Sequence, residues 1–120
     1  MSSPEIRLKR AYEAPAEDDG LRVLVERLWP RGLSKADAAI DHWTKDVAPT
    51  PQLRTWFGHR AERWREFRRR YRAELSRNSA AVEALKGLCA GQKVTFVFAA
   101  RDVERNGAVV LREFLLSEPG

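Results

Sequence analysis

Apolar residues along the chain form short continuous runs that alternate with runs of helical spacing. Residues 6–12, 21 to about 28 and 93–100 are rich in residue types that favour strands, and residues 93–100 give the clearest strand pattern. Residues 23–25 are apolar without interruption, which is typical of a strand buried on both faces of a parallel sheet. Residues 40–47 mix strand-forming and polar side chains and predict at most one further, short strand.

Helical spacing and cap residues predict five helices. Thr50 is placed to cap a helix with Pro51 at its first position, and Gly58 is placed to end it. Ser34, with Asp37 three residues later, resembles a capping box. The predicted helices cover residues 35–39, 51–57, 60–77, 79 to about 91, and 108–116.

Strands that alternate with helices indicate an α/β fold, with a small, mainly parallel β-sheet of three to four strands covered by helices on both faces. A chain of 120 residues, 43% hydrophobic and 32% charged, is expected to fold as a single domain (residues 1–120) with a core of its own. Residues 1–5 and 117–120 are expected to fray.

The positive charge of the chain is confined to one predicted helix. The formal net charge is +5, and residues 60–77 contain eight arginines and three glutamates, so this segment accounts for the whole excess. Its aromatic residues recur at helical spacing and are expected to face the core rather than nucleic-acid bases. The Arg-rich face is either a solvated helix surface or a surface for nucleic acid or an acidic protein.

Several classes of protein and site are not supported by the sequence. The longest apolar run is far shorter than the ~18 residues of a membrane span, and the first residues lack the pattern of a signal peptide. The single cysteine, Cys89, lies on an apolar helical stripe and is expected to be a buried thiol in a reducing environment. We therefore expect a soluble, cytoplasmic protein without membrane association. His42 and His59 have no metal-ligand spacing, so a metal site is a less favoured alternative.

Two apolar strands run directly into charged pairs. Glu26-Arg27 follows residues 23–25, and Arg101-Asp102 follows the strand at residues 93–100. In a parallel sheet these pairs would meet at the edge formed by the carboxyl ends of the strands, where open α/β sheets bind ligands. Crossed ion pairs, Glu26 with Arg101 and Asp102 with Arg27, would merely close the strand ends. Alternatively, some of these charges remain available to a ligand.

Other residues near these pairs suit an anionic ligand. Arg31 lies in the Trp-Pro-Arg-Gly turn that leads into a predicted helix, and Asn106 precedes the last helix. Helix N-termini attract anions, although the glycines match no phosphate-binding loop. His59, in a helix–helix corner, is the candidate proton carrier.

The chain resembles the YeaO-like proteins, a bacterial branch of the domain-of-unknown-function family numbered 488. The resemblance is carried by residues 24–32, 56–59 and 99–102, together with single positions such as Asp41, Trp43, Lys45, Trp64 and Tyr71. It implies a compact α/β fold and a cytoplasmic protein, and it brings no settled activity. Its polar positions add Arg54 to the candidate ligand-binding residues.

The chain departs from the pattern of that family in two places. Many relatives have Asp at the position of Glu26, and the wider family tends to have a Cys-His-Arg triplet after its last strand. Here that loop reads Arg105-Asn106-Gly107, so thiol or imidazole chemistry there cannot be transferred.

The leading hypothesis is a protein, whether or not an enzyme, that binds an anionic small molecule or nucleotide at the carboxyl edge of its sheet. Arg27 and Arg31 would hold the anion, Asp102 and Asn106 would orient it, and His59 would carry a proton. Glu26, Arg54 and Arg101 complete the candidate set. The alternatives are an adaptor that uses the helix at residues 60–77 and a metal-binding protein. The sequence identifies no cofactor, reaction or oligomeric state.

Overall fold

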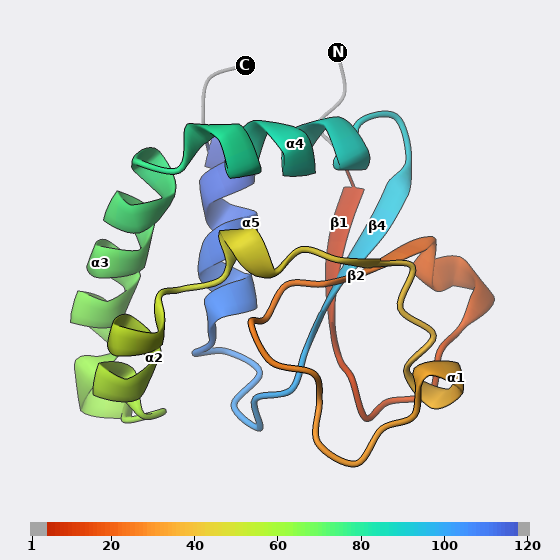
Figure 1. Ribbon diagram of the computed structural model, residues 1–120, viewed down its shortest axis with the longest axis horizontal. Coiled ribbons are helices and arrows are strands. Elements are labelled where there is room, and N and C mark those ends of the chain that lie inside the picture. Colours follow the sequence, from red (N-terminus) through yellow and green to blue (C-terminus); the bar gives the residue numbers. More distant parts are fainter. Residues whose placement is uncertain (1–4, 118–120) are drawn as a thin grey trace.

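The computed structural model describes residues 5–117 as a four-stranded sheet with helices packed against it (Figure 1). All neighbouring strands are parallel, in the order β1-β4-β2-β3. The strands are β1 (Glu5–Arg10), β2 (Leu21–Leu24), β3 (His42–Trp43) and β4 (Lys93–Phe98). The helices are α1 (Lys35–Ala38), α2 (Pro51–Phe57), α3 (Trp64–Ser76), α4 (Ser79–Cys89) and α5 (Gly107–Ser117), with 3-10 turns at Glu17–Asp19, Lys45–Val47 and Ala61–Arg63. The predicted small parallel α/β fold is confirmed.

Fraying is predicted for residues 1–5 and 117–120. Of these, residues 1–4 and 118–120 lie outside the described residues. The two positions that are described are Glu5, the first residue of β1, and Ser117, the last residue of α5. No helix among residues 5–117 has the length and apolar character needed to cross a membrane.

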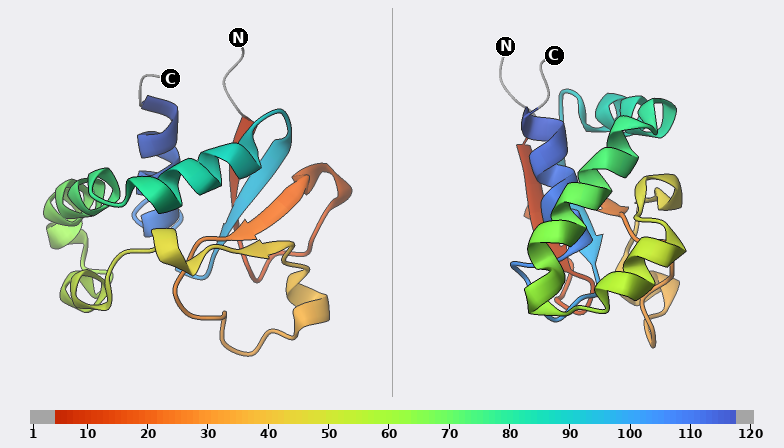
Figure 2. Two further views of the ribbon diagram at one scale, coloured as in Figure 1. Left: turned by 45° about the horizontal axis from the view of Figure 1, so that its top comes forward. Right: turned by 90° about the vertical axis from the view of Figure 1, so that its left-hand side faces the viewer.

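The main core lies between one face of the sheet and helices α2 to α5. Val23, Phe96 and Phe98 of the two central strands point into it, and Tyr71 of α3 and Leu111 of α5 meet them there. All five side chains are at most 2% exposed. Helices α3 and α5 pack side by side within this layer, as Figures 1 and 2 show. This packing fixes where the outer faces of both helices point.

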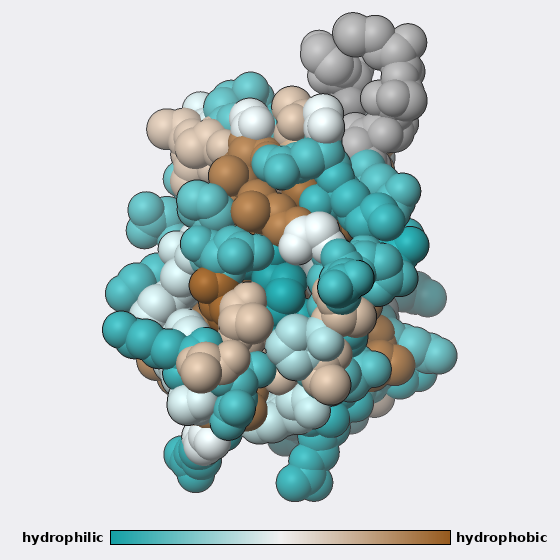
Figure 3. All heavy atoms as spheres, turned by 90° about the vertical axis from the view of Figure 1, so that its right-hand side faces the viewer, coloured by the Kyte–Doolittle hydropathy of each residue, from teal (hydrophilic) through white to brown (hydrophobic). Residues whose placement is uncertain are grey.

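The opposite face of the sheet is covered mainly by the segment between β2 and β3, which includes α1. Leu24 and Val97 form a second, smaller core there, covered by Trp29, Leu33 and Ile40. The outer surface on this side of the molecule is largely hydrophilic, with small apolar patches between the polar side chains (Figure 3).

A buried ion pair fastens this covering segment to the sheet. The Arg22 guanidinium lies 2.6 Å from the Asp19 carboxylate, and both residues are 4% exposed. Arg22 also donates hydrogen bonds to the carbonyls of Ala38 and Ala39 at the end of α1. The Lys9 ammonium gives Asp19 a second cationic partner at 3.1 Å. Every charged atom in this cluster therefore has a partner, as burial requires.

The predicted helix boundaries agree closely with the structure. Ser34 and Thr50 accept hydrogen bonds from the backbone N–H groups of Asp37 and Leu53, as expected of N-caps. Gly58 adopts a left-handed conformation (φ 52°) that ends α2. The α-helical part of the predicted helix 60–77 begins only at Trp64, because the left-handed turn at residues 58 and 59 leads first into the 3-10 turn. Helix α4 stops at Cys89, slightly before the predicted end.

The strands are shorter than the sequence pattern predicts. The strand predicted to reach residue 28 ends at Leu24, although the Val25 N–H still donates to the Val97 carbonyl at 3.3 Å. The next donor along β4, the Ala99 N–H, bonds to the Glu26 carboxylate instead of to a backbone carbonyl. A side chain thus takes the place of the backbone hydrogen bond that would continue the sheet, and the strand ends there. The segment at residues 40–47 contains only a two-residue strand, followed by a 3-10 turn.

Candidate functional site

The segments that follow β1, β2 and β4 lie at one end of the sheet, the lower end in Figure 1. We call this end the carboxyl edge. It contains Glu26 and Arg27 after β2, and Arg101 and Asp102 after β4. The position of both charged pairs agrees with the sequence prediction, but their side-chain contacts do not.

The predicted crossed ion pairs are not formed among the described residues. Asp102 accepts hydrogen bonds from the backbone N–H groups of Glu104 and Arg105, and it pairs with the Arg105 guanidinium at 3.1 Å. The Glu104 N–H has the largest influence and lowers the pKa of the Asp102 carboxyl. Desolvation opposes it, but the Arg105 N–H and guanidinium also act to lower the pKa, and the net shift is downward. Arg27 donates to the carbonyls of Ala48 and Pro49, at 3.3 and 3.4 Å. Asp102 thus bonds within its own loop, and Arg27 bonds to the backbone before α2, so the crossed-pair alternative is not realised among these residues.

Glu26 is the half-buried acid of the carboxyl edge. Its carboxylate accepts the Ala99 N–H at 3.0 Å and makes no salt bridge with the described residues. Burial raises the pKa of the Glu26 carboxyl, while the Ala99 N–H and the nearby Arg54 guanidinium act in the opposite direction. A carboxyl group in this state takes up a proton more readily than an exposed one and can then donate a hydrogen bond.

Three predicted cationic residues have side chains without hydrogen-bond or ion-pair partners in the described part of the chain. Arg54 projects from α2 close enough to Glu26 to influence its pKa. Arg101 follows Ala100 and is exposed, and Arg31 is exposed in the turn after β2. Only the backbone carbonyl of Arg31 is bonded, to the Tyr12 hydroxyl at 2.9 Å. These guanidiniums are available to an external anion.

The other candidates have structural contacts or lie apart. Asn106 is 2% exposed, donates to the Asp102 carbonyl and accepts the Val109 N–H, so it caps α5. His59 is exposed at φ 57°, and its ring contacts Phe57 with a centroid distance of 5.9 Å. No described contact joins His59 to Asp102, so the two candidate catalytic residues are not assembled into an acid–base pair.

Two further cationic residues were not predicted as site residues, and only Arg10 of these lies at the carboxyl edge. Arg10, the last residue of β1, donates to the carbonyls of Ala99 and Ala100 and lies 5.2 Å from the centroid of the Tyr12 ring. Its position at a strand end was the available signal, but β1 is not an uninterrupted apolar run. Arg77 lines a cavity of about 330 Å³ together with Arg27, and no local pattern connects these two residues.

The described residues contain no group of three or more His, Cys, Asp or Glu side chains that could hold a metal ion. The Cys89 thiol is buried in the main core, and burial raises its pKa to about 11. A buried, protonated thiol is a poor nucleophile and a poor metal ligand. The chemistry available at the carboxyl edge is therefore that of guanidiniums and one half-buried carboxyl group.

Comparison with known proteins identifies the relatives of the chain. Residues 5–119 match the family described as the inactive DUF488-N3 subclade. An uncharacterized protein of Mycobacterium tuberculosis is 46% identical over 110 residues, which are 92% of each chain. The uncharacterized protein YeaO of Escherichia coli is 37% identical over 112 residues, which are 93% of this chain and 97% of YeaO. No solved structure matches the chain significantly.

Proposed function

We propose that this chain, which belongs to the DUF488 family and to its subclade described as inactive, binds an anionic small molecule at the carboxyl edge. In this proposal the chain catalyses no reaction on that molecule. The observation that carries the proposal is that Arg54 lies near Glu26 without an ion pair between them. A half-buried carboxyl group with a raised pKa lies beside a guanidinium, and no salt bridge joins them.

A phosphate or carboxylate group would interact with both of these side chains. The Arg54 guanidinium would supply charge-assisted hydrogen bonds, and the protonated Glu26 carboxyl would donate one more. Arg31 and Arg101 add positive charge at the same edge and have no partners of their own among the described residues. Four groups at the end of a parallel sheet thus favour an anion over a cation or a neutral ligand.

The loop after β4 supports a binding role without catalysis. In the resemblance to the wider family, a Cys-His-Arg triplet follows the last strand, whereas this chain has Arg105, Asn106 and Gly107. Arg105 pairs with Asp102 and Asn106 caps α5. Gly107 begins α5 and lies against Pro49 and Tyr71, at distances where a Cβ atom would make ordinary contacts of 3.5 and 3.6 Å. Each of these positions has a structural role, and none supplies a nucleophile.

The proposal is tested by calorimetric titration of the purified protein with inorganic phosphate and with adenosine monophosphate. Arg54→Gln is expected to weaken binding about 10- to 100-fold, the loss of one hydrogen bond from a charged group. Arg65→Gln is the matched control, since Arg65 is an exposed arginine of α3 that makes no described ion pair. Equal affinity in both variants, or no binding of either anion by the unmodified protein, would contradict the proposal.

The pH dependence of binding provides a second test. Because the neutral form of Glu26 favours an anion and the ionised form repels it, binding is expected to weaken as pH rises through the raised pKa of Glu26. Glu26→Gln retains a neutral donor at every pH, so this variant is expected to bind with little pH dependence over that range. A Glu26→Gln variant with the same pH dependence as the unmodified protein would exclude this role for Glu26.

A further inference from the structure

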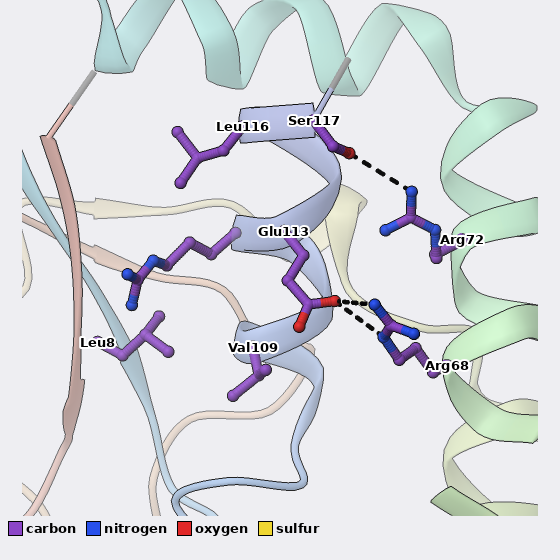
Figure 4. Close-up of a pocket in the computed structure, with 8 residues that line it drawn as sticks. Leu8, Arg68, Arg72, Val109, Glu113, Leu116 and Ser117 are labelled. Atoms are coloured by element: carbon purple, nitrogen blue, oxygen red, sulfur yellow. Dashed lines mark hydrogen bonds and ion pairs between the residues drawn. The ribbon is translucent and has the colours of Figure 1, made fainter. Parts of the chain in front are cut away.

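A groove runs along the outer face of α5, away from the carboxyl-edge residues. Its volume is about 610 Å³, and we call it the α5 groove. Figure 4 shows Val109, Glu113 and Leu116 on α5, with Leu8 of β1 on one side and α3 on the other. This size is within the range of sites that hold a ligand or a partner's side chains.

The floor of the α5 groove is apolar. Val109 and Leu116 are two helical turns apart, so they lie on the same face of α5. Leu116 is 40% exposed, although large apolar side chains of this chain are mostly buried. Leu8 is half-buried and comes from β1, the edge strand of the sheet. Together these three side chains supply the apolar part of the groove's lining.

Guanidinium groups border this apolar floor. Arg68 pairs with Glu113 at 2.7 Å, which leaves this part of the border neutral. Arg72 lies over the Phe114 ring and donates to the Ser117 hydroxyl at 3.4 Å, but it has no acidic partner among the described residues. Arg112 likewise makes no described ion pair. The groove therefore carries an excess of two positive charges.

We propose that the α5 groove docks an acidic, amphipathic segment of a partner protein. Apolar side chains of the segment would cover Val109 and Leu116, and its carboxylates would pair with Arg72 and Arg112. An amphipathic helix presents apolar and acidic residues at the spacing that this floor and border require.

A nucleic acid fits the groove less well than a protein. Binding of single strands depends on exposed aromatic rings on which bases stack. The aromatic residues Phe67 and Tyr71 of α3 are at most 2% exposed and face the main core. The Trp56 ring, on another side of α3, is covered by the guanidiniums of Arg63 and Arg70, at 5.0 and 4.5 Å from its centroid. An apolar floor without accessible aromatic rings favours a polypeptide.

The probe is a fluorescein-labelled helical peptide of about 18 residues, or five turns, with Leu at every third or fourth position and Glu at most others. Binding to the full chain is followed by fluorescence anisotropy. Leu116→Glu is expected to lower the affinity at least tenfold, because it places a like charge on the floor. Val103→Glu is the matched control, since Val103 is also apolar and exposed but lies in the loop before α5.

Two double variants test whether the arginines of the groove, rather than the general positive charge of the chain, bind the peptide. Arg72→Gln/Arg112→Gln is expected to weaken binding at least tenfold, whereas Arg65→Gln/Arg69→Gln, with the same change in net charge, is expected to change it less than threefold. Circular dichroism confirms that each variant is folded. A variant that is unfolded is replaced by Lys substitutions of the same residues, which keep the charge and are expected to bind.

Four results would overturn the proposal. The first two are no binding of the acidic peptide and an equal loss of peptide affinity in the two double arginine variants. The third is equal affinity for a peptide with Ser in place of Leu. The fourth is displacement of the peptide by a single-stranded oligouridylate that binds more tightly. The last result would assign the groove to nucleic acid. Since none of these variants changes Glu26 or Arg54, failure here leaves the anion-binding proposal untouched.

Discussion

Replacement of Arg22 by methionine is expected to destabilise the fold more than loss of a surface arginine does. Methionine has a similar length and can fill the buried space, but it cannot donate a hydrogen bond. The substitution removes a guanidinium that is 4% exposed, together with its contact to Asp19 at 2.6 Å and its bonds to the carbonyls of Ala38 and Ala39. The segment that covers the second face of the sheet would lose its main polar attachment.

The magnitude follows from the groups left behind. Removal of one partner of a buried ion pair costs about 3–5 kcal/mol. Asp19 keeps Lys9 at 3.1 Å and the Ala16 N–H at 3.0 Å, which lowers the cost. Two carbonyls lose a donor, which raises it. We expect a loss of about 4 kcal/mol in the free energy of unfolding, a large fraction of the 5–15 kcal/mol that is typical of a domain.

Urea titration, followed by circular dichroism and tryptophan fluorescence, measures this loss. Arg7→Met is the matched control: Arg7 lies on β1 and pairs with Asp18 at 3.2 Å, but the two side chains are 47% and 66% exposed. An exposed pair contributes about 0–1 kcal/mol, so the control is expected to unfold near the midpoint of the unmodified protein. If Arg22→Met costs no more than Arg7→Met, the buried cluster does not stabilise the fold as argued.

The same cluster has a defined pH dependence. Burial opposes ionisation of Asp19, but hydrogen bonds from Ala16, Lys9 and Arg22 outweigh it and lower the pKa of the Asp19 carboxyl below its ordinary value of 3.8. The stabilisation that the ionised Asp19 carboxylate gives the fold is therefore present above that value, and it is lost as pH falls through the lowered pKa. Arg22→Met is expected to lose less stability over this acidic range than the unmodified protein.

Two further predictions concern the backbone and the thiol. Gly20→Ala is expected to lower the free energy of unfolding by more than about 2 kcal/mol, because φ is +66° and a Cβ would lie 2.4 Å from the Lys93 carbonyl oxygen. Gly91→Ala, with φ +73° and open space around the Cβ position, is expected to lower it by about 1–2 kcal/mol. Equal losses in urea titration would contradict the clash at Gly20. Cys89, 1% exposed with its pKa raised to about 11, is expected to react with a disulfide reagent at pH 8 only after denaturation, and rapid reaction of the folded protein would show that the thiol is accessible.

The elements that sequence reasoning predicted best are those with local signals. Thr50, Pro51 and Gly58 each act within a few residues of their own positions, and α2 begins and ends where they indicate. The position of the two charged pairs at one edge also follows from local information, because parallel strands place their carboxyl ends together.

Side-chain partners at that edge were not predictable in the same way. Whether Asp102 bonds to its own loop or to a residue across the sheet depends on the conformation of the loop, which no spacing in the sequence reveals. The Glu26 contact to Ala99 joins positions 73 residues apart and ends a strand that the apolar pattern would continue. The Asp19–Arg22 pair was missed because a charged residue before an apolar run is ordinarily expected at the surface, whereas Arg22 is buried and bonds to the end of α1.

The proposed anion site depends on which arginines are unpaired rather than on how many arginines a segment contains. Acidic side chains neutralise part of the positive charge of α3, since Glu66 pairs with both Arg69 and Arg70. At the carboxyl edge, Glu26 bonds to the backbone N–H of Ala99, and Arg54 makes no ion pair among the described residues. An exposed, unpaired guanidinium keeps its full attraction for a ligand, while a paired one must first give up its partner. Variants compared at equal net charge therefore test the two proposed sites directly, because any difference between such variants comes from pairing and position.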